Sequence, residues 1–364
     1  MISILVTFYD NRRMLRVCLD RLLPTLSGHD AEVVVVDDNP ERPLVIPDEF
    51  ADLVRVVRSP SNLGYSGACN LGVDSARGEQ ILFLDCDIVV TDGWLTAMLH
   101  SLQQYPDAGA VSAKILDLST GRIAHFGAAV HEVDSIHPYQ DNDADFSLSC
   151  EDRQFRIMVS GALLMDRQFF RTLGGFDFDL RNAFGDFELA LKMAEAGRPA
   201  RISARSIVYH RGVVSGAARY AHYADAKALF FKRWGTRVGS EGLTFLTEAA
   251  FLLRGRTSAI PHIAVNLSSS IFSSDYIRAA VDGAGLRLLQ TYNPRSLDKN
   301  MPHIRLEDRL DWELCRLNVP LLYFVDRYRA VADNHYWFEH RMNRDDLVAD
   351  RNGNIAPVSA IRTT

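Results

Sequence analysis

The sequence has few cysteines, and they are widely spaced. Its 364 residues contain five, and no two of them form a CxxC pair; they are Cys18, Cys69, Cys86, Cys150 and Cys315. An odd number of scattered cysteines argues against a disulfide framework and against a zinc site built from cysteines. We therefore expect free thiols in a reducing, cytoplasmic environment.

Net positive charge and long apolar runs are also lacking. The formal net charge is -6, which gives no reason to expect a nucleic-acid partner. No apolar run approaches the roughly 20 residues that a membrane-spanning helix needs. The opening residues Met1 to Thr7 have no basic region of the kind that begins a signal peptide. With 47% hydrophobic and 24% charged residues, the composition is that of a globular protein without a transmembrane segment.

In the first half of the sequence, short apolar runs typical of strands alternate with segments of helical periodicity. Buried strands are predicted by short apolar runs rich in β-branched residues, at Ile2 to Tyr9, Val33 to Val36, Leu53 to Val57, Ile81 to Leu84 and Ala108 to Ala113. Helices are predicted between them, at Leu15 to Leu26, Gly67 to Ala76 and Trp94 to Leu102. This alternation indicates an α/β fold with a mostly parallel sheet and helices on both of its faces.

The second half has a weaker pattern. Residues 134 to 154 are polar and acidic, so we expect a mobile loop there, followed by a helix at Asp186 to Ala196 and a strand at Ala200 to Val208. After about residue 240 we expect an α-rich extension. Its predicted helices are Leu243 to Leu253 and Leu321 to Met342, and its predicted strands are Ile263 to Leu267 and Leu286 to Leu289.

Polar residues follow three of the predicted strands. In open parallel sheets, ligands bind outside the carboxyl ends of the strands. The residues at those ends are Thr7 and Tyr9, Asp37 and Asp38, and Asp85 and Asp87. We expect them to converge on one crevice.

The triplet Asp85-Cys86-Asp87 has two interpretations. If the strand continues, the two carboxylates point to one side, and like charges that close are relieved by a cation. A divalent ion takes oxygen ligands, and a diphosphate supplies further oxygens. Acids also commonly end strands in a turn. On the triplet alone, both interpretations carry equal weight.

The other polar segments are ambiguous in the same way. Asp37-Asp38-Asn39-Pro40 suits a nucleoside contact or an Asx turn. Asn62 to Asn70 packs small residues before a helix, as phosphate-binding loops do, but it does not match GxGxxG. Asp186 suits a general base or a plain helix cap, and a lone histidine such as His210 is more often structural than a ligand.

In their order along the chain, these segments resemble the family-2 glycosyltransferases of the GT-A fold. Leu82 to Asp87 is similar to their DxD element, and Phe184 to Leu189 is similar to the block that carries their catalytic acid. The resemblance covers about residues 1 to 235 and also rests on Ile4 to Tyr9, Val35 to Asn39, Asn62 to Gly72, Ser160 to Ala162, Gly174 to Asp177 and His210. One departure is Gly185, where many relatives carry glutamate.

The resemblance implies a role for each matching residue. Asp186 would be the catalytic base, and Mn²⁺ or Mg²⁺ would bind Asp87, with His210 and Asp85. Nucleotide-sugar contacts would come from Thr7, Tyr9, Asp38, Asn62, Gly64, Gly67, Asn70 and Asp85. The acceptor side would comprise Gly161, Ala162 and Glu188.

The implied activity is metal-dependent, inverting transfer of a sugar from a nucleoside-diphosphate sugar to a hydroxyl acceptor. The acceptor would be a growing glycan, a lipid-linked sugar or a small molecule. The glycosyltransferase domain would span residues 1–235, with a nucleotide-sugar half at 1–115 and an acceptor half at 116–235. Residues 236–364 would be an accessory domain.

The accessory domain contains the aromatic and basic stretch His335 to Arg341. This stretch suits a homodimer interface or peripheral contact with the cytoplasmic face of a membrane. It equally suits a buried helix with a solvated face.

Two alternative functions use the same kind of fold. A sugar-phosphate nucleotidyltransferase needs a glycine-rich loop after the first strand, but Tyr9 to Arg13 contains no glycine. A non-catalytic sugar-nucleotide or glycan-binding module needs no catalytic acid, so the presence of Asp85, Asp87 and Asp186 argues against it. A membrane-embedded synthase fits less well, because spanning helices are absent and Phe230 to Trp234 lacks the glutamine of its QxxRW signature.

Overall fold

The structure, a computed structural model, divides into two compact units, Met1–Gly239 and Ser240–Thr364. It describes residues 1–131, 134–140, 142–211, 222–238, 263–267, 287–290, 317–325, 338, 341, 345–350 and 355–358. Each unit is considered by itself. In the described part of the chain, no helix is both long and apolar enough to cross a membrane.

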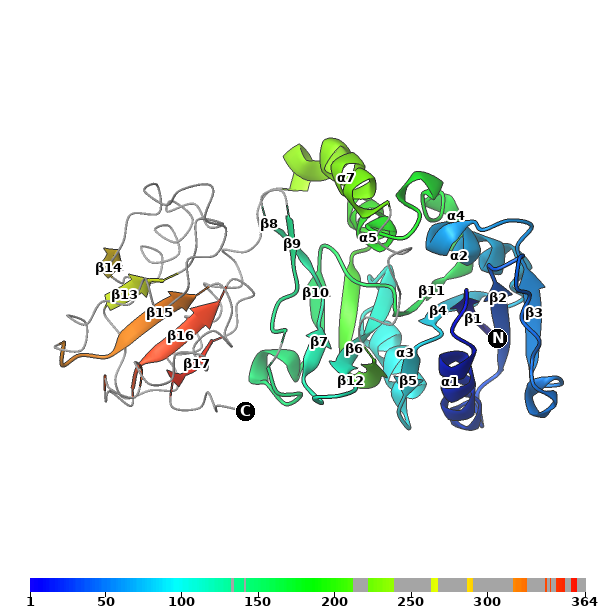
Figure 1. Ribbon diagram of the computed structural model, residues 1–364, viewed down its shortest axis with the longest axis horizontal. Helices are drawn as coiled ribbons and strands as arrows, with labels where there is room; N and C mark the ends of the chain where they lie inside the picture. Colours follow the sequence, from blue (N-terminus) through cyan, green and yellow to red (C-terminus); the bar gives the residue numbers. More distant parts are fainter. Residues whose placement is uncertain are drawn as a thin grey trace. The chain divides into compact units, whose positions relative to one another are not determined.

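The first unit begins with alternating strands and helices (Figure 1). They are β1 (Ile2–Phe8), α1 (Arg12–Thr25), β2 (Ala31–Asp37), η1 (Asp48–Phe50), β3 (Val54–Arg58), α2 (Gly64–Ser75), β4 (Gln80–Asp85), β5 (Ile88–Val90) and α3 (Trp94–Gln104). Each strand and helix predicted in this part is present, with bounds shifted by a few residues. The alternation of apolar runs with helical periods therefore predicted these elements, and it missed only the short η1 and β5 among them.

The remaining elements of the first unit are more varied in length. They are β6 (Ala110–Asp117), β7 (Ile123–His125), β8 (Ala129–His131), β9 (Asp134–Ile136), η2 (Ser147–Ser149), β10 (Arg153–Phe155), β11 (Ala162–Asp166), α4 (Arg167–Thr172), η3 (Phe178–Leu180), α5 (Gly185–Glu195), β12 (Ala200–His210) and α7 (Tyr223–Val238). The helix and strand expected near Asp186 and Ala200 are confirmed as α5 and β12.

One ten-stranded sheet runs through the first unit. Its main order is β10-β12-β6-β11-β4-β1-β2-β3, with β5 paired to β12 and β7 paired to β6. β4, β1, β2 and β3 are mutually parallel, and β6 is parallel to β12. β11 lies antiparallel between β4 and β6 and so joins the two parallel sets. The predicted mostly parallel sheet is confirmed.

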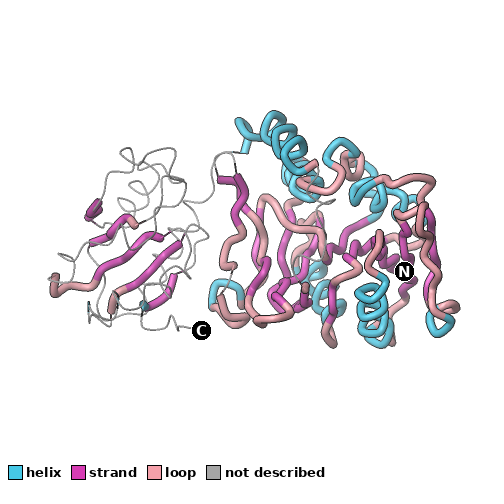
Figure 2. Tube along the Cα trace, in the orientation of Figure 1, coloured by secondary structure: helices cyan, strands magenta, loops and turns pink. Residues whose placement is uncertain are grey.

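Helices cover both faces of this sheet (Figure 2). On one face, side chains of α1 and α3 pack with Ile4, Val6 and other strand residues in a buried apolar cluster. On the other face lies α2, whose Gly72 would place an added Cβ within 3.0 Å of Val36 and 3.3 Å of Leu5. A residue without a side chain allows this close approach of helix and sheet.

The loop expected at residues 134–154 is more ordered than predicted, because β9, η2 and part of β10 lie in it. Lys114 reaches this segment from β6 with a side chain that is 2% exposed. Its Nζ donates to the carbonyl of Ala144 at 2.8 Å and to Oγ of Ser149 at 3.2 Å. The acidic composition suggested a solvated loop, but a buried amine from a distant strand organises the segment.

The described residues of the second unit form a separate five-stranded sheet. Its order is β14-β13-β15-β16-β17, with all neighbours parallel except β16 and β17. The strands are β13 (Ile263–Asn266), β14 (Arg287–Gln290), β15 (Leu321–Val325), β16 (Leu347–Asp350) and β17 (Ile355–Pro357). The two strands predicted in this unit are confirmed as β13 and β14.

The helix expected at Leu321 to Met342 is wrong for its first five residues, which form β15. All five are buried, and a strand covered on both faces has a continuous apolar run that cannot be told from a buried helix by its period. The described residues of the second unit thus lie mainly in strands, whereas we expected an α-rich extension. The helix expected at Leu243 to Leu253 lies outside the described residues.

Two residues of the stretch His335 to Arg341 are described, and both are buried. The ring of Phe338 packs against Tyr323 with centroids 5.2 Å apart. Nε of Arg341 lies 2.9 Å from Oδ2 of Asp346, with both side chains almost fully enclosed. These contacts fit the buried alternative for the two positions and leave the interface alternative a prediction for the rest of the stretch.

In the first unit, Glu188 joins α5 to α7. Its side chain is almost fully enclosed, and Oε1 accepts hydrogen bonds from Nη1 of Arg233 at 3.2 Å and Nε1 of Trp234 at 3.1 Å. Oε2 lies 3.2 Å from Nζ of Lys192. Removing this carboxylate would take its acceptor from the buried Nε1 of Trp234 and would break one of the contacts of Arg233, which also binds Asp177.

We expect Glu188→Ala to lower the free energy of unfolding by about 1–3 kcal/mol, because enclosed polar groups lose their partner. Urea unfolding followed by circular dichroism measures the change. The matched control is Glu195→Ala in the same helix, whose ion pair with Arg237 is half exposed and should cost about 0–1 kcal/mol. Equal losses in the two variants would contradict the assigned role of Glu188.

Candidate active site

A cavity of about 880 Å³ opens at the carboxyl ends of β1 and β4. Ten residues singled out from the sequence line it: Thr7, Tyr9, Asp38, Asn62, Gly64, Asp85, Asp87, Gly161, Asp186 and His210. The pairing of the strands brings the first of these together, since Thr7 is in register with both Val36 of β2 and Asp85 of β4. The expected crevice is therefore present.

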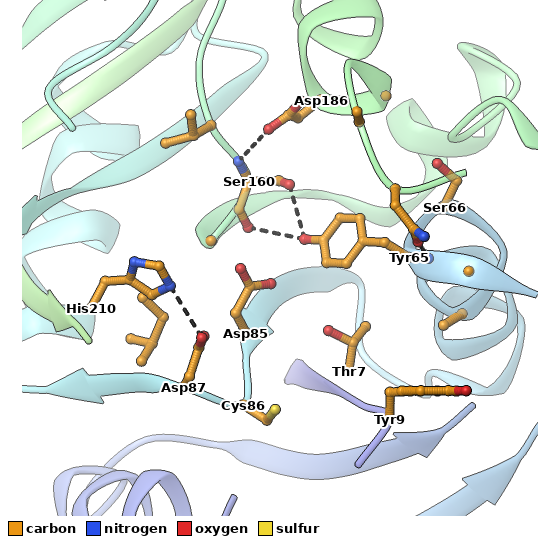
Figure 3. Close-up of a pocket in the computed structure, with 18 of the residues that line it drawn as sticks. Thr7, Tyr9, Tyr65, Ser66, Asp85, Cys86, Asp87, Ser160, Asp186 and His210 are labelled. Atoms are coloured by element: carbon orange, nitrogen blue, oxygen red, sulfur yellow. Dashed lines mark hydrogen bonds and ion pairs between the residues drawn. The ribbon is translucent and has the colours of Figure 1, made fainter. Parts of the chain in front are cut away.

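Asp85 and Asp87 both extend from the end of β4 toward the cavity (Figure 3). The strand ends at Asp85, and Cys86 and Asp87 lie in a turn. Oδ2 of Asp87 is 3.2 Å from Nε2 of His210, the last residue of β12. The amide of Asp85 donates to the carbonyl of Gly161 at 3.0 Å, which places this acid beside the acceptor-side segment.

Thiols near these acids are poorly suited to nucleophilic chemistry. Cys18 and Cys69 are buried, and Cys86 is partly so. Burial raises the pKa of each thiol, and the negative charge of Asp85 raises each further. The thiolate is the reactive form, so these cysteines are held in the unreactive thiol form.

Asp38 organises the loop that precedes α2. Its carboxylate is 5% exposed and accepts hydrogen bonds from the amides of Leu63 and Gly64, both at 2.8 Å. Burial raises the pKa of Asp38, although these hydrogen bonds oppose the rise. Gly64 has a φ of +74°, which favours glycine, so this turn needs the residue found there.

Its neighbour Asp37 is a structural residue. Oδ2 of Asp37 accepts from the amide of Leu44 at 2.7 Å, and Oδ1 accepts from that of Asn39 at 3.3 Å. Asp37 does not line the cavity. Of the two acids at the end of β2, the turn interpretation fits Asp37, and Asp38 faces the cavity.

Asp186 lies in the first turn of α5, two residues after a strained residue. Phe184 has a φ of +63°, an uncommon conformation for a side chain of this size. Oδ2 of Asp186 accepts from the amide of Ser160 at 3.1 Å, and Oδ1 accepts from the amide of Phe187 at 3.0 Å. Burial raises the pKa of Asp186 to about 6; the two amide hydrogen bonds oppose the rise, and the charge of Asp85 adds to it.

A carboxylate with this pKa can accept a proton near neutral pH. Its position and its pKa both suit a general base, which the sequence left as an alternative to a helix cap. The strain at Phe184 is typical of residues next to functional groups.

Four residues expected at the site do not line the cavity. Gly67 allows α2 to pack, since an added Cβ would lie 2.6 Å from Leu63 and 3.1 Å from the ring of Phe178. Asn70 holds Phe176 by hydrogen bonds to its carbonyl and from its amide, at 2.8 and 3.0 Å. Ala162 pairs with Leu84 inside the sheet, and Glu188 joins α5 to α7. These residues shape the walls behind the cavity.

The sequence reasoning missed several lining residues. Tyr65 and Ser160 lie in segments that it quoted, but they received no role, because their hydrogen bond joins positions 95 residues apart. His125 and His137 face one another with their Nδ1 atoms 3.1 Å apart, and both line the cavity. No residue pattern pointed to them, since they come from a short strand and from the segment expected to be a loop.

Within the described ranges, no three or more histidine, cysteine or acidic side chains are grouped to hold a metal ion on their own. Asp87 and His210 supply two potential ligands at their 3.2 Å contact, and Asp85 lies nearby on the cavity wall. A cation bound here would draw its other ligands from a bound molecule or from water.

Comparison with known proteins finds glycosyltransferases similar to part of the chain. The family model described as glycosyl transferase family 2 matches residues 3–145. The O-antigen biosynthesis protein RfbC of Myxococcus xanthus is 29% identical over 236 residues, covering 62% of this chain and 18% of the relative. A pre-mycofactocin glycosyltransferase of Mycobacterium tuberculosis is 26% identical over 195 residues, covering 53% of this chain and 39% of the relative.

Among solved structures, GalNAc-T7 crystallised with UDP, GalNAc and Mn²⁺ is similar, with a TM-score of 0.51 and 14% identity. The match covers 79% of this chain and 55% of that structure, and at this identity it establishes the fold alone. The fold is the GT-A fold predicted from the sequence. The chain spans less than two fifths of the length of either curated relative. The similarity to glycosyl transferase family 2 is therefore shown for residues 3–145.

Proposed function

We propose that the chain transfers a sugar from a nucleoside-diphosphate sugar to an acceptor hydroxyl, with Asp186 as the general base. One observation carries the proposal: Asp186, with a pKa raised to about 6, lines the same cavity as Asp85, Asp87 and His210. The family of residues 3–145 and the names of the relatives support this class of reaction.

The donor would bind at the carboxyl ends of β1 and β2. Thr7, Tyr9 and Asp38 lie there, and Asn62 and Gly64 add the loop before α2. Amides at a helix start favour phosphate, although Asp38 already accepts from two of them. We therefore propose that Asp38 contacts the nucleoside and also holds the conformation of the loop that binds it.

Mn²⁺ or Mg²⁺ would be held by Asp87, with His210 and Asp85. Asp87 and His210 offer a carboxylate oxygen and an imidazole nitrogen 3.2 Å apart, and both atoms are of types that bind divalent ions. A nitrogen ligand favours Mn²⁺ over Mg²⁺. When bound, such an ion supplies positive charge that stabilises a leaving diphosphate.

In the proposed reaction, the acceptor oxygen attacks the anomeric carbon while Asp186 takes its proton. The bond from the anomeric carbon to the diphosphate oxygen breaks, and the nucleoside diphosphate leaves with that electron pair. Attack on the face opposite the leaving group inverts the configuration. The acceptor would be a glycan, a lipid-linked sugar or a small molecule; it would lie near Gly161 and Asp186, with Ala162 and Glu188 supporting from behind.

Asp186→Asn is expected to fold and to bind donor, because the amide keeps the size of the carboxylate. Transfer should fall by about 100-fold or more, because an amide cannot take the proton. Nucleoside diphosphate release in the presence of acceptor measures transfer, and a thermal-shift assay with donor measures binding. Undiminished transfer would contradict the assignment of Asp186 as the general base.

The pH dependence of kcat/KM should report the same carboxylate. A raised pKa means that Asp186 keeps its proton up to about pH 6, so activity should be full above that value and fall as the pH drops below it. Initial rates from pH 5 to 8 on the folded protein test this. A flat profile down to pH 5 would contradict it.

Asp87→Ala should remove the dependence of donor binding on metal. In the unchanged protein we expect Mn²⁺ to tighten donor binding, and in the variant the gain should shrink about 10- to 100-fold. Isothermal titration calorimetry with and without Mn²⁺ gives both numbers. Asp10→Ala is the control, since Asp10 also lines the cavity but pairs with Arg42 at its exposed rim. Equal metal dependence in all three proteins would argue against a metal site at Asp87.

A further inference from the structure

Tyr65 reaches across the cavity wall toward the segment that holds Asp186 (Figure 3). It lies in the first turn of α2, and its hydroxyl is 2.9 Å from Oγ of Ser160 and 3.4 Å from the carbonyl of the same residue. Burial raises the pKa of the Tyr65 phenol well above its usual range, so the hydroxyl keeps its proton and can donate it. Tyr65 therefore fixes both the side chain and the main chain of Ser160.

Ser160 in turn holds the proposed base. Its main-chain amide donates to Oδ2 of Asp186 at 3.1 Å. This hydrogen bond comes from outside α5, whereas the one from the amide of Phe187 comes from the adjacent residue of the helix. The direction of Asp186 thus depends on where Ser160 lies, and no secondary-structure element spans Ser160 itself.

The main chain of Tyr65 is held by the segment that precedes Asp186. The amide of Tyr65 donates to Oδ1 of Asn182 at 2.9 Å, and the amide of Ser66 donates to the carbonyl of Arg181 at 2.8 Å. The ring of Tyr65 meets Phe176 edge-on, with centroids 6.0 Å apart. Tyr65 is therefore a rigid support, which connects Ser160 with the segment directly before the base.

The same loop is held on its donor side by Asp38. The amides of Leu63 and Gly64, directly before Tyr65, donate to the Asp38 carboxylate. Hydrogen bonds thus connect the end of β2, the start of α2, Ser160 and Asp186 in one continuous set. A base must lie within hydrogen-bond reach of the proton that it takes, and small displacements are costly.

We propose that Tyr65 is a positioning residue, which aims the Asp186 carboxylate through the hydroxyl and amide of Ser160. This proposal rests on the proposed function, because it assigns Tyr65 a role in the reaction of Asp186. Tyr65 acts on the base through Ser160 and makes no bond to the substrates. Its loss should therefore change the chemical step and leave donor affinity as it is.

The test compares Tyr65→Phe, Ser160→Ala and the double variant. Tyr65→Phe keeps the ring and removes the hydroxyl, and Ser160→Ala keeps the amide that Asp186 accepts from. We expect each single variant to lower kcat about 10-fold with donor KM unchanged, and the double variant to lose no more than either one. The acid limb of the pH profile should also shift in Tyr65→Phe, since the environment of Asp186 changes.

The matched control is Tyr139→Phe. Tyr139 is a buried phenol of the same unit whose oxygen accepts from Arg153 at 2.6 Å, and it does not line the cavity. It should lose stability as Tyr65→Phe does, measured by urea unfolding, while keeping kcat and the pH profile. Equal falls in kcat for Tyr65→Phe and Tyr139→Phe would show a merely structural role.

Failures of the two proposals can be told apart. If the unchanged protein transfers sugar and Asp186→Asn does not, the proposed function stands whatever Tyr65→Phe does. In that case, any of three results would overturn the role of Tyr65. They are full activity in Tyr65→Phe, a fall in kcat of the double variant equal to the product of the two single falls, and a raised donor KM. If the unchanged protein transfers no sugar from any nucleoside-diphosphate sugar that stabilises it, the proposed function itself fails.

Discussion

The parallel pairing of β4, β1 and β2 is the constraint on which the rest of the site depends. Parallel strands end at the same edge, and the register sets Thr7 level with Asp85 and Phe8 level with Asp37. Residues separated by tens of positions thus meet around one cavity. The helices on the faces follow from the same pairing, because a connection between two parallel strands must cross over one face of the sheet and usually does so as a helix.

The antiparallel strand β11 adds a second wall to the cavity formed at the ends of these parallel strands. It pairs with β4 and β6, so the residues just before it reach the cavity beside Asp85. Ser160 and Gly161 lie in that approach, and α5 brings Asp186 to the amide of Ser160. One sheet therefore connects the pair Asp87 and His210, the loop before α2 and Asp186, and their spacing is set by backbone pairing.

The electrostatics of the cavity follow from what encloses each acid. Asp37 and Asp38 are neighbours in sequence, yet Asp37 caps a turn and Asp38 faces the cavity and holds the loop before α2. Asp186 gains a raised pKa mainly from burial, and Asp87 is paired with a histidine. Similar side chains thus acquire different chemistry because their desolvation and their partners differ.

The sequence by itself determined the strand and helix order of residues 1–117, the fold family and ten of the lining residues, because period and motif order are local properties. It failed for residues 134–154 and for Leu321–Val325, where a buried lysine and a sheet covered on both faces decide the structure. Only the tertiary structure showed that Gly67, Asn70 and Glu188 support the walls, and that Tyr65 and Ser160 hold Asp186. Those roles depend on hydrogen bonds and packing between residues far apart in sequence, which no local pattern encodes.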